Sequence, residues 1–191
     1  MEKDSEKEID KYFSRKINNS LNELSTEIFF EMRRVTEEAS SRGMMQSGMF
    51  IVNLLDTITN NTINSCKEKL QLIDEFQEYM RITLSTDQLN NIENKFIDSY
   101  TSFFMQMVEI EYKNEISKIL GDLESINMTS EAKINNSFNK IRALIIDKVE
   151  DVRVKNKLQK EEPSVRLAKN SNSIAFLALV VSIISIILGF L

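Results

Sequence analysis

The sequence of 191 residues contains no histidine, no tryptophan, one proline, one cysteine and four glycines. Without histidine, the chain lacks the side chain that most often acts as a general base near neutral pH, and also the commonest zinc ligand. A single cysteine excludes a disulfide within the chain and any cysteine-cluster metal site. The scarcity of proline and glycine argues against an all-β fold and favours long helices.

The residues that are present form no recognisable catalytic or metal-binding motif. The phosphate-binding GxGxxG and Walker spacings, the EF-hand spacing and the Glu-x-x-His pairs of di-metal bundles do not occur. Composition leaves a serine–lysine nucleophile open, but the sequence predicts no strand-to-helix elbow that would present one. We therefore expect a non-enzymatic protein with no cofactor and no metal, in which Cys66 is a reduced thiol facing a helical core.

Apolar residues recur every three or four positions along most of the chain, which predicts amphipathic α-helices. The first helix is expected to begin at Ser5, because Ser5 and Glu8 form a capping-box pattern, and to run for roughly 35 residues. Its apolar stripe consists of Phe13, Ile17, Leu21, Leu24, Ile28, Met32 and Val35.

Three further stripes predict three further helices. The second continues through the polar run "TNNTINS" as one helix to about Thr83. The third runs from Leu89 to Ile126, with Met107 and Tyr112 as consecutive members, and the fourth runs from Ile134 to Val152 with the near-heptad spacing typical of coiled coils. The expected caps are Ser85 or Thr86 for the third helix and Thr129 or Ser130 for the fourth.

The segment between the first two helices allows two interpretations. Ala39, Gly43 and Ser47 are spaced by four, so on a continuous helix they would form a ridge of small side chains that lets another backbone approach closely. Alternatively, a turn at 41–43 separates two antiparallel helices. With short connections and stripes that must be buried, residues 1–158 are expected to form an elongated bundle of three to four long helices, completed by a second copy of the chain where needed.

The net charge of −5 is distributed unevenly. Residues 1–154 carry −8, which does not favour nucleic acid, whereas residues 155–169 carry +3. This basic stretch precedes an apolar segment, so the positive-inside rule predicts a cytoplasmic N-terminal domain, with 159–173 as a basic juxtamembrane linker. The juxtamembrane basic residues are Lys155, Lys157, Lys160, Arg166 and Lys169.

The segment 174–191 has no charged side chain, and 13 of its 18 residues are Ile, Leu, Val or Phe. As a helix it would be about 27 Å long, close to the roughly 30 Å hydrocarbon thickness of a bilayer. We therefore expect a single-pass, tail-anchored membrane protein. The small residues lie on one helical face, which predicts packing against another transmembrane helix. They are Ala175, Ala178, Ser182, Ser185 and Gly189.

Two functions of different classes fit these expectations. The first is a non-enzymatic, tail-anchored helical module that contacts lipid, self-associates as a homo-oligomer and binds a protein partner. The alternative is a self-assembling membrane-permeabilising effector, of the pore or toxin type, whose soluble bundle regulates the transmembrane helices. A tethering protein with SNARE-like topology fits less well, because no long uninterrupted zipper with a central polar layer is present.

Overall fold

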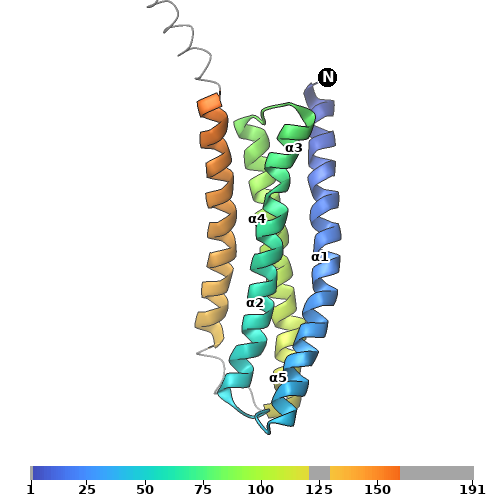
Figure 1. Ribbon diagram of the computed structural model, residues 1–191, viewed down its shortest axis with the longest axis vertical. Helices are drawn as coiled ribbons and strands as arrows, with labels where there is room; N and C mark the ends of the chain where they lie inside the picture. The colour runs from blue at the N-terminus through green and yellow to red at the C-terminus, as the bar shows by residue number, and fades with distance from the viewer. Residues whose placement is uncertain (1, 121–129, 160–191) are drawn as a thin grey trace, which may run out of the picture. The chain divides into compact units, whose positions relative to one another are not determined.

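The structure is a computed structural model that describes residues 2–120 and 130–159, and all the regular elements in these residues are helical (Figure 1). The chain divides into two compact units, residues 1–150 and 151–191. The helices are α1 (Glu2–Ser41), α2 (Gly48–Leu70), α3 (Leu72–Met80), α4 (Thr86–Met107), the π-helix η1 (Val108–Tyr112), α5 (Lys113–Leu120) and a helix over 130–159.

Residues 1–150 form a bundle in which consecutive long helices alternate in direction (Figure 1). α1 contacts both α2 and α4, while α3 extends the line of α2, and η1 and α5 extend that of α4. Residues 130–150 supply the fourth helix of this unit. The predicted all-α fold with long helices in a bundle is confirmed.

No helix in the described part of the chain is both long enough and apolar enough to cross a membrane. The predicted transmembrane helix 174–191 lies outside the described residues, as does the predicted linker 159–173 except for its first residue. The predicted N-terminal domain 1–158 includes all of the first unit and the described beginning of the second.

The core forms from the predicted stripes. On α1, Phe13, Ile17 and Ile28 are completely buried, while Leu21 and Val35 at the edge of the stripe are half-buried. Full burial of one such side chain contributes roughly 1.5–3 kcal/mol relative to leaving it in water. The stripe therefore sets the face that α1 turns inward.

The second predicted helix is interrupted and ends early. A break at Gln71 separates α2 from α3, and α3 stops at Met80 instead of near Thr83. Arg81 adopts the left-handed conformation (φ 52°, ψ 41°) and its backbone N–H donates to the carbonyls of Gln77 and Glu78. A residue with a Cβ is rarely found in this conformation, and it turns the chain out of the helix.

The π-helix η1 explains a five-residue gap in the third stripe. Met107 and Tyr112 are both buried although an α-helix of 3.6 residues per turn would rotate them apart. The Lys113 N–H donates to the carbonyl of Val108, five residues earlier, so the wider turn absorbs one extra residue. As a result, the stripe continues on the same face through Ile116, which is buried.

The segment between α1 and α2 contains the turn and not the ridge. α1 ends at Ser41, Gly43 has φ +66°, and Ser47 is the N-cap of α2, where its Oγ accepts from the Phe50 N–H. A Cβ placed on Gly43 would meet nothing within 4 Å, so no backbone approaches it. The predicted close-packing ridge of Ala39, Gly43 and Ser47 is therefore corrected: the glycine is needed for its left-handed conformation.

The start of α4 is stabilised by a capping box. Ser85 Oγ accepts from the Gln88 N–H (3.2 Å), and the Gln88 side chain accepts from the Ser85 N–H (2.9 Å). Ser85, and not Thr86, is thus the cap of the third predicted helix.

We expect Ser85→Ala to lower the free energy of unfolding by about 1 kcal/mol, because a backbone N–H of the first turn loses its acceptor. Urea denaturation followed by circular dichroism measures this change. Thr86→Ala is the matched control and should change stability little, since no hydrogen bond involves the Thr86 side chain in the described residues. Equal losses of unfolding free energy in the two variants would contradict the assignment of Ser85 as the cap of α4.

Candidate interaction surface

A groove between α1 and α3 is a mostly apolar cavity at the surface of the described residues, with a volume of about 680 Å³. Its floor is formed by Ile9 and Phe76, which are nearly buried, and by the ring of Tyr12, whose centroid lies 4.9 Å from that of Phe76. We call this feature the α1–α3 groove. Its lining residues are Glu8, Ile9, Lys11, Tyr12, Arg15, Glu75, Phe76, Tyr79, Met80 and Ile82.

The α3 side of the groove exposes large apolar side chains to solvent. Tyr79 is 85% exposed, Met80 is 50% exposed and Ile82 is 40% exposed. Tyr79 lies on the solvent-facing side of α3, three residues after the buried Phe76, whereas Met80 and Ile82 lie where the helix ends. Clustered exposed apolar side chains rimmed by polar ones are typical of interaction surfaces, since their burial by a partner is favourable.

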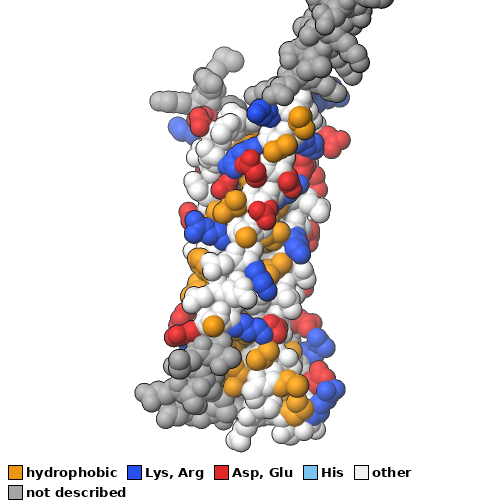
Figure 2. Space-filling model, turned by 90° about the vertical axis from the view of Figure 1, so that its left-hand side faces the viewer, with side chains coloured by type: hydrophobic (Ala, Val, Ile, Leu, Met, Phe, Trp, Pro, Cys, Tyr) orange, Lys and Arg blue, Asp and Glu red, His pale blue; other side chains and the backbone are white. Residues whose placement is uncertain are grey.

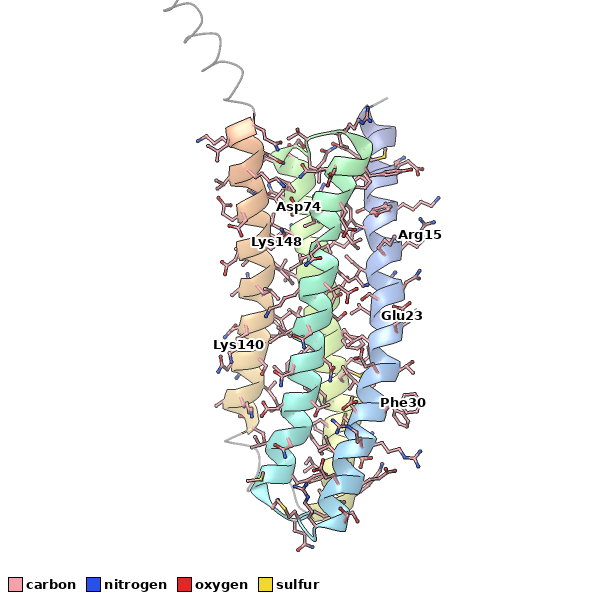
Figure 3. The ribbon with its side chains drawn as sticks, in the orientation of Figure 1. Arg15, Glu23, Phe30, Asp74, Lys140 and Lys148 are labelled. Carbon is pink, nitrogen blue, oxygen red and sulfur yellow. The ribbon has the colours of Figure 1, made fainter. Side chains whose placement is uncertain are left out.

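The rim of the groove carries charges of both signs. Lys11 and Arg15 lie one turn apart on α1, Glu8 precedes them on the same helix, and Glu75 lies on α3. Within the described part of the chain, none of these four side chains forms an ion pair. In Figure 3, Arg15 points away from the bundle. The rim therefore presents two cations and two anions to a binding partner.

Other exposed apolar side chains occur in smaller groups. Phe29 and Phe30 on α1 are 51% and 61% exposed and contact each other edge to face, with centroids 5.9 Å apart. Figure 3 labels Phe30 on the outer side of α1. On the face shown in Figure 2, hydrophobic side chains are interspersed with acidic and basic ones. The α1–α3 groove differs from these because its exposed side chains border a cavity with an apolar floor.

Hydroxyl groups in the interior form hydrogen bonds between the helices. Ser20 of α1, Ser65 of α2 and Tyr100 of α4 share hydrogen bonds of 3.1 to 3.4 Å. Thr59 of α2 donates to Ser137 on the helix over 130–150 (3.0 Å). No buried side-chain nitrogen or oxygen in the described residues lacks a hydrogen-bond partner.

Two buried groups that could act as nucleophiles are held in their neutral forms. Burial raises the pKa of the Cys66 thiol to about 12, and it also raises the pKa of the Tyr100 phenol to about 12 against the opposing effect of its serine partners. The thiolate, which is the nucleophilic form of cysteine, is therefore not populated near neutral pH. Cys66 is free and buried, as predicted.

Ion pairs join helices of the first unit. Lys95 of α4 pairs with Asp10 and also contacts Ser14 of α1, while Lys133 pairs with Asp56 of α2 at 2.8 Å. Lys148 Nζ lies 2.6 Å from Asp74 Oδ2 of α3. Figure 3 labels both residues. This last pair places the final turn of residues 130–150 beside α3, so the chain leaves the first unit at the end that carries the groove.

Most of the predicted site residues lie outside the described residues. These are the predicted transmembrane packing face (Ala175, Ala178, Ser182, Ser185 and Gly189) and the basic residues Lys160, Arg166 and Lys169. Lys155 and Lys157 lie on the helix over 130–159 with exposed side chains. Among the described residues, no three cysteine, aspartate or glutamate side chains are grouped as metal ligands.

Sequence reasoning missed the α1–α3 groove. The available signal was the run Tyr79, Met80 and Ile82, in which Tyr79 and Ile82 do not belong to the predicted stripe of the second helix. Periodicity alone could not show that α3 ends before Ile82, because the end depends on the left-handed conformation of Arg81.

We expect alkaline pH to destabilise the bundle through Cys66 and Tyr100. The folded pKa of each is about 12, whereas unfolded thiols and phenols titrate near about 8.5 and about 10. The unfolded state therefore binds fewer protons than the native state, so the free energy of unfolding is fully retained below about pH 8 and falls as pH rises toward 12. Urea unfolding at a series of pH values measures this slope.

The double variant Cys66→Ala with Tyr100→Phe should lose most of that pH dependence, although its stability at neutral pH is lower. The matched control is Tyr79→Phe, which removes an exposed phenol and should leave the profile unchanged. If the slope of unfolding free energy against pH were unaltered in the double variant, groups other than Cys66 and Tyr100 would determine the pH dependence.

Comparison with known proteins adds no family to this description. No family model matches the sequence, and no curated protein or solved structure is significantly similar to it. Function therefore has to be argued from the groove, the core and the sequence of the chain.

Proposed function

We propose that this chain is a non-enzymatic, membrane-anchored helical module whose bundle self-associates and binds a protein partner. The observation that carries the proposal is the α1–α3 groove. Its exposed Tyr79, Met80 and Ile82 border an apolar floor, in a bundle whose described residues leave no buried side-chain nitrogen or oxygen without a hydrogen-bond partner. A groove of this kind suits an apolar helical or loop surface from another protein.

The membrane anchor is supported by the sequence of 174–191. This segment is long enough to span the hydrocarbon layer as a helix, and the basic residues before it favour retention of the bundle in the cytoplasm.

The alternative function is a membrane-permeabilising effector. It is favoured by one feature of the sequence, the small face that includes Ser182 and Ser185, because serines can hydrogen-bond between helices or to water in an assembled path. The absence of any charge in 174–191 argues against efficient ion conduction. We therefore rank it second.

We expect removal of residues 171–191 to transfer the protein from the membrane fraction to the soluble fraction. The full chain should resist carbonate extraction, because burial of 13 large apolar side chains in lipid favours insertion by about 4 to 8 kcal/mol. Protease added outside intact cells should leave the bundle uncut. A truncated protein that stays in the membrane fraction would overturn the anchor.

Measurement of membrane potential separates the two functions. Expression of the full chain should leave cells polarised if the chain is an association module. The alternative predicts depolarisation that the double variant Ser182→Leu with Ser185→Leu abolishes, because these substitutions remove the polar groups from the small face. Ala178→Leu is the control that fills the same face without removing a hydroxyl.

A further inference from the structure

We propose that the α1–α3 groove binds the same groove of a second copy of this chain, related to the first by a twofold axis. This inference rests on the proposed function in one respect, since the anchor would hold the copies in the same membrane. It goes further by assigning the association surface, its symmetry and its charge pairs.

A twofold interface requires a surface that is complementary to itself. The groove satisfies this requirement because its rim holds two cations and two anions around an apolar centre. Glu8 and Arg15 are seven residues apart on α1, so they lie two turns apart on the same face. When two α1 helices pair antiparallel, Glu8 of each copy lies opposite Arg15 of the other.

Lys11 and Glu75 complete the charge balance of the rim. They lie on opposite walls of the groove, on α1 and α3. When α1 pairs with α1, the α3 wall of each copy faces the α3 wall of the other, so Lys11 and Glu75 of both copies surround the same apolar centre. None of the four rim side chains has an ion pair to break first within the described residues.

The apolar centre supplies the association energy. Tyr79, Met80 and Ile82 are 85%, 50% and 40% exposed, and a second copy would remove them from water together with Tyr12 on the groove floor. Charges at the rim then select the register, since an out-of-register pairing places like charges together.

The charge pattern favours a second copy over a lipid surface as the occupant. An anionic bilayer would attract Lys11 and Arg15 but repel Glu8 and Glu75, which border the same apolar side chains. A second copy matches both signs at once. The groove spans about two turns of α1, so its contact area is small, and confinement of both copies to one membrane raises their effective concentration.

The test uses the full chain in isolated membranes, with Thr83→Cys as a crosslinking site, because Thr83 is exposed, follows Ile82 and does not line the groove. Cys66 is completely buried and its raised pKa keeps it a thiol, so the substituted cysteine is the reactive one among the described residues. A long-armed bis-maleimide should yield a covalent dimer. The control Phe30→Cys, at a 61% exposed position of α1 outside the groove, should yield far less.

Charge reversal in the Thr83→Cys background tests the pairing. Lys11→Glu with Arg15→Glu makes the rim entirely acidic, and Glu8→Lys with Glu75→Lys makes it entirely basic. Each double variant alone should lose crosslinked dimer by about tenfold or more, because every rim pair becomes repulsive. Mixed in one membrane, the two should recover heterodimer to about the original yield, because all pairs are again opposite in sign.

Matched controls carry the same charge changes elsewhere. Lys140→Glu with Arg142→Glu, and Glu23→Lys with Glu27→Lys, alter exposed positions away from the groove, and Figure 3 shows Lys140 and Glu23 pointing away from the bundle. These variants should keep the dimer yield. Such a result excludes an effect of net charge alone.

Three outcomes would overturn the inference: no dimer from Thr83→Cys, equal yields from Thr83→Cys and Phe30→Cys, or failure of the mixed variants to recover. A crosslink from Thr83→Cys to a different protein would overturn it as well. Each of these leaves the anchor intact if residues 171–191 still direct the chain to the membrane. Conversely, a truncated chain that stays membrane-bound overturns the proposed function and not the pairing of grooves.

Discussion

The bundle depends on the burial of hydroxyl groups along one polar stretch of α2. The run 59–65 would be expected to weaken a helix, yet two of its hydroxyls bond to three different neighbours: Ser65 to Ser20 and Tyr100, and Thr59 to Ser137. An unsatisfied buried hydroxyl costs roughly 1–3 kcal/mol, so sliding any neighbour by one turn would be penalised. Apolar stripes alone tolerate such slips, because Leu, Ile and Phe pack in many registers. The hydroxyls therefore specify one alignment of the helices.

The same alignment determines which surface remains for interaction. With α2 fixed by its hydroxyls, the break at Gln71 and the left-handed Arg81 decide where α3 ends. Phe76 packs against Tyr12 and Phe13, while Tyr79 three residues later stays 85% exposed. An exposed tyrosine beside an apolar floor lowers the solubility of the protein. Its presence fits a surface that is covered in the working state of the protein.

Local chemistry made much of the fold predictable from the sequence, and tertiary geometry explains the rest. The cap of α4 at Ser85, one of the two residues expected, and the stripe of Phe13, Ile17 and Ile28 depend on the spacing of residues along one helix, so the sequence predicts them. The π-helix was visible only as a five-residue gap, which could equally have marked a kink. The ridge of Ala39, Gly43 and Ser47 failed because the conformation of Gly43 depends on where α1 and α2 turn toward each other. The α1–α3 groove combines residues some 65 positions apart, and no periodicity brings them together.

The charge of the chain gives the proposed pairing of grooves a further physical reason. Residues 1–154 carry −8, so two copies held side by side on a membrane repel each other over most of their surfaces. At ionic strengths near 0.15 M this repulsion acts within about 8 Å, which is the range in which a contact has to form. The groove rim is locally neutral, with two cations and two anions around exposed apolar side chains. It is therefore a place where copies of an acidic bundle can approach without net repulsion, and the opposite signs fix their relative direction. The net negative charge of residues 1–154 thus suppresses non-specific contacts between copies. The balanced charge of the groove rim permits a specific contact.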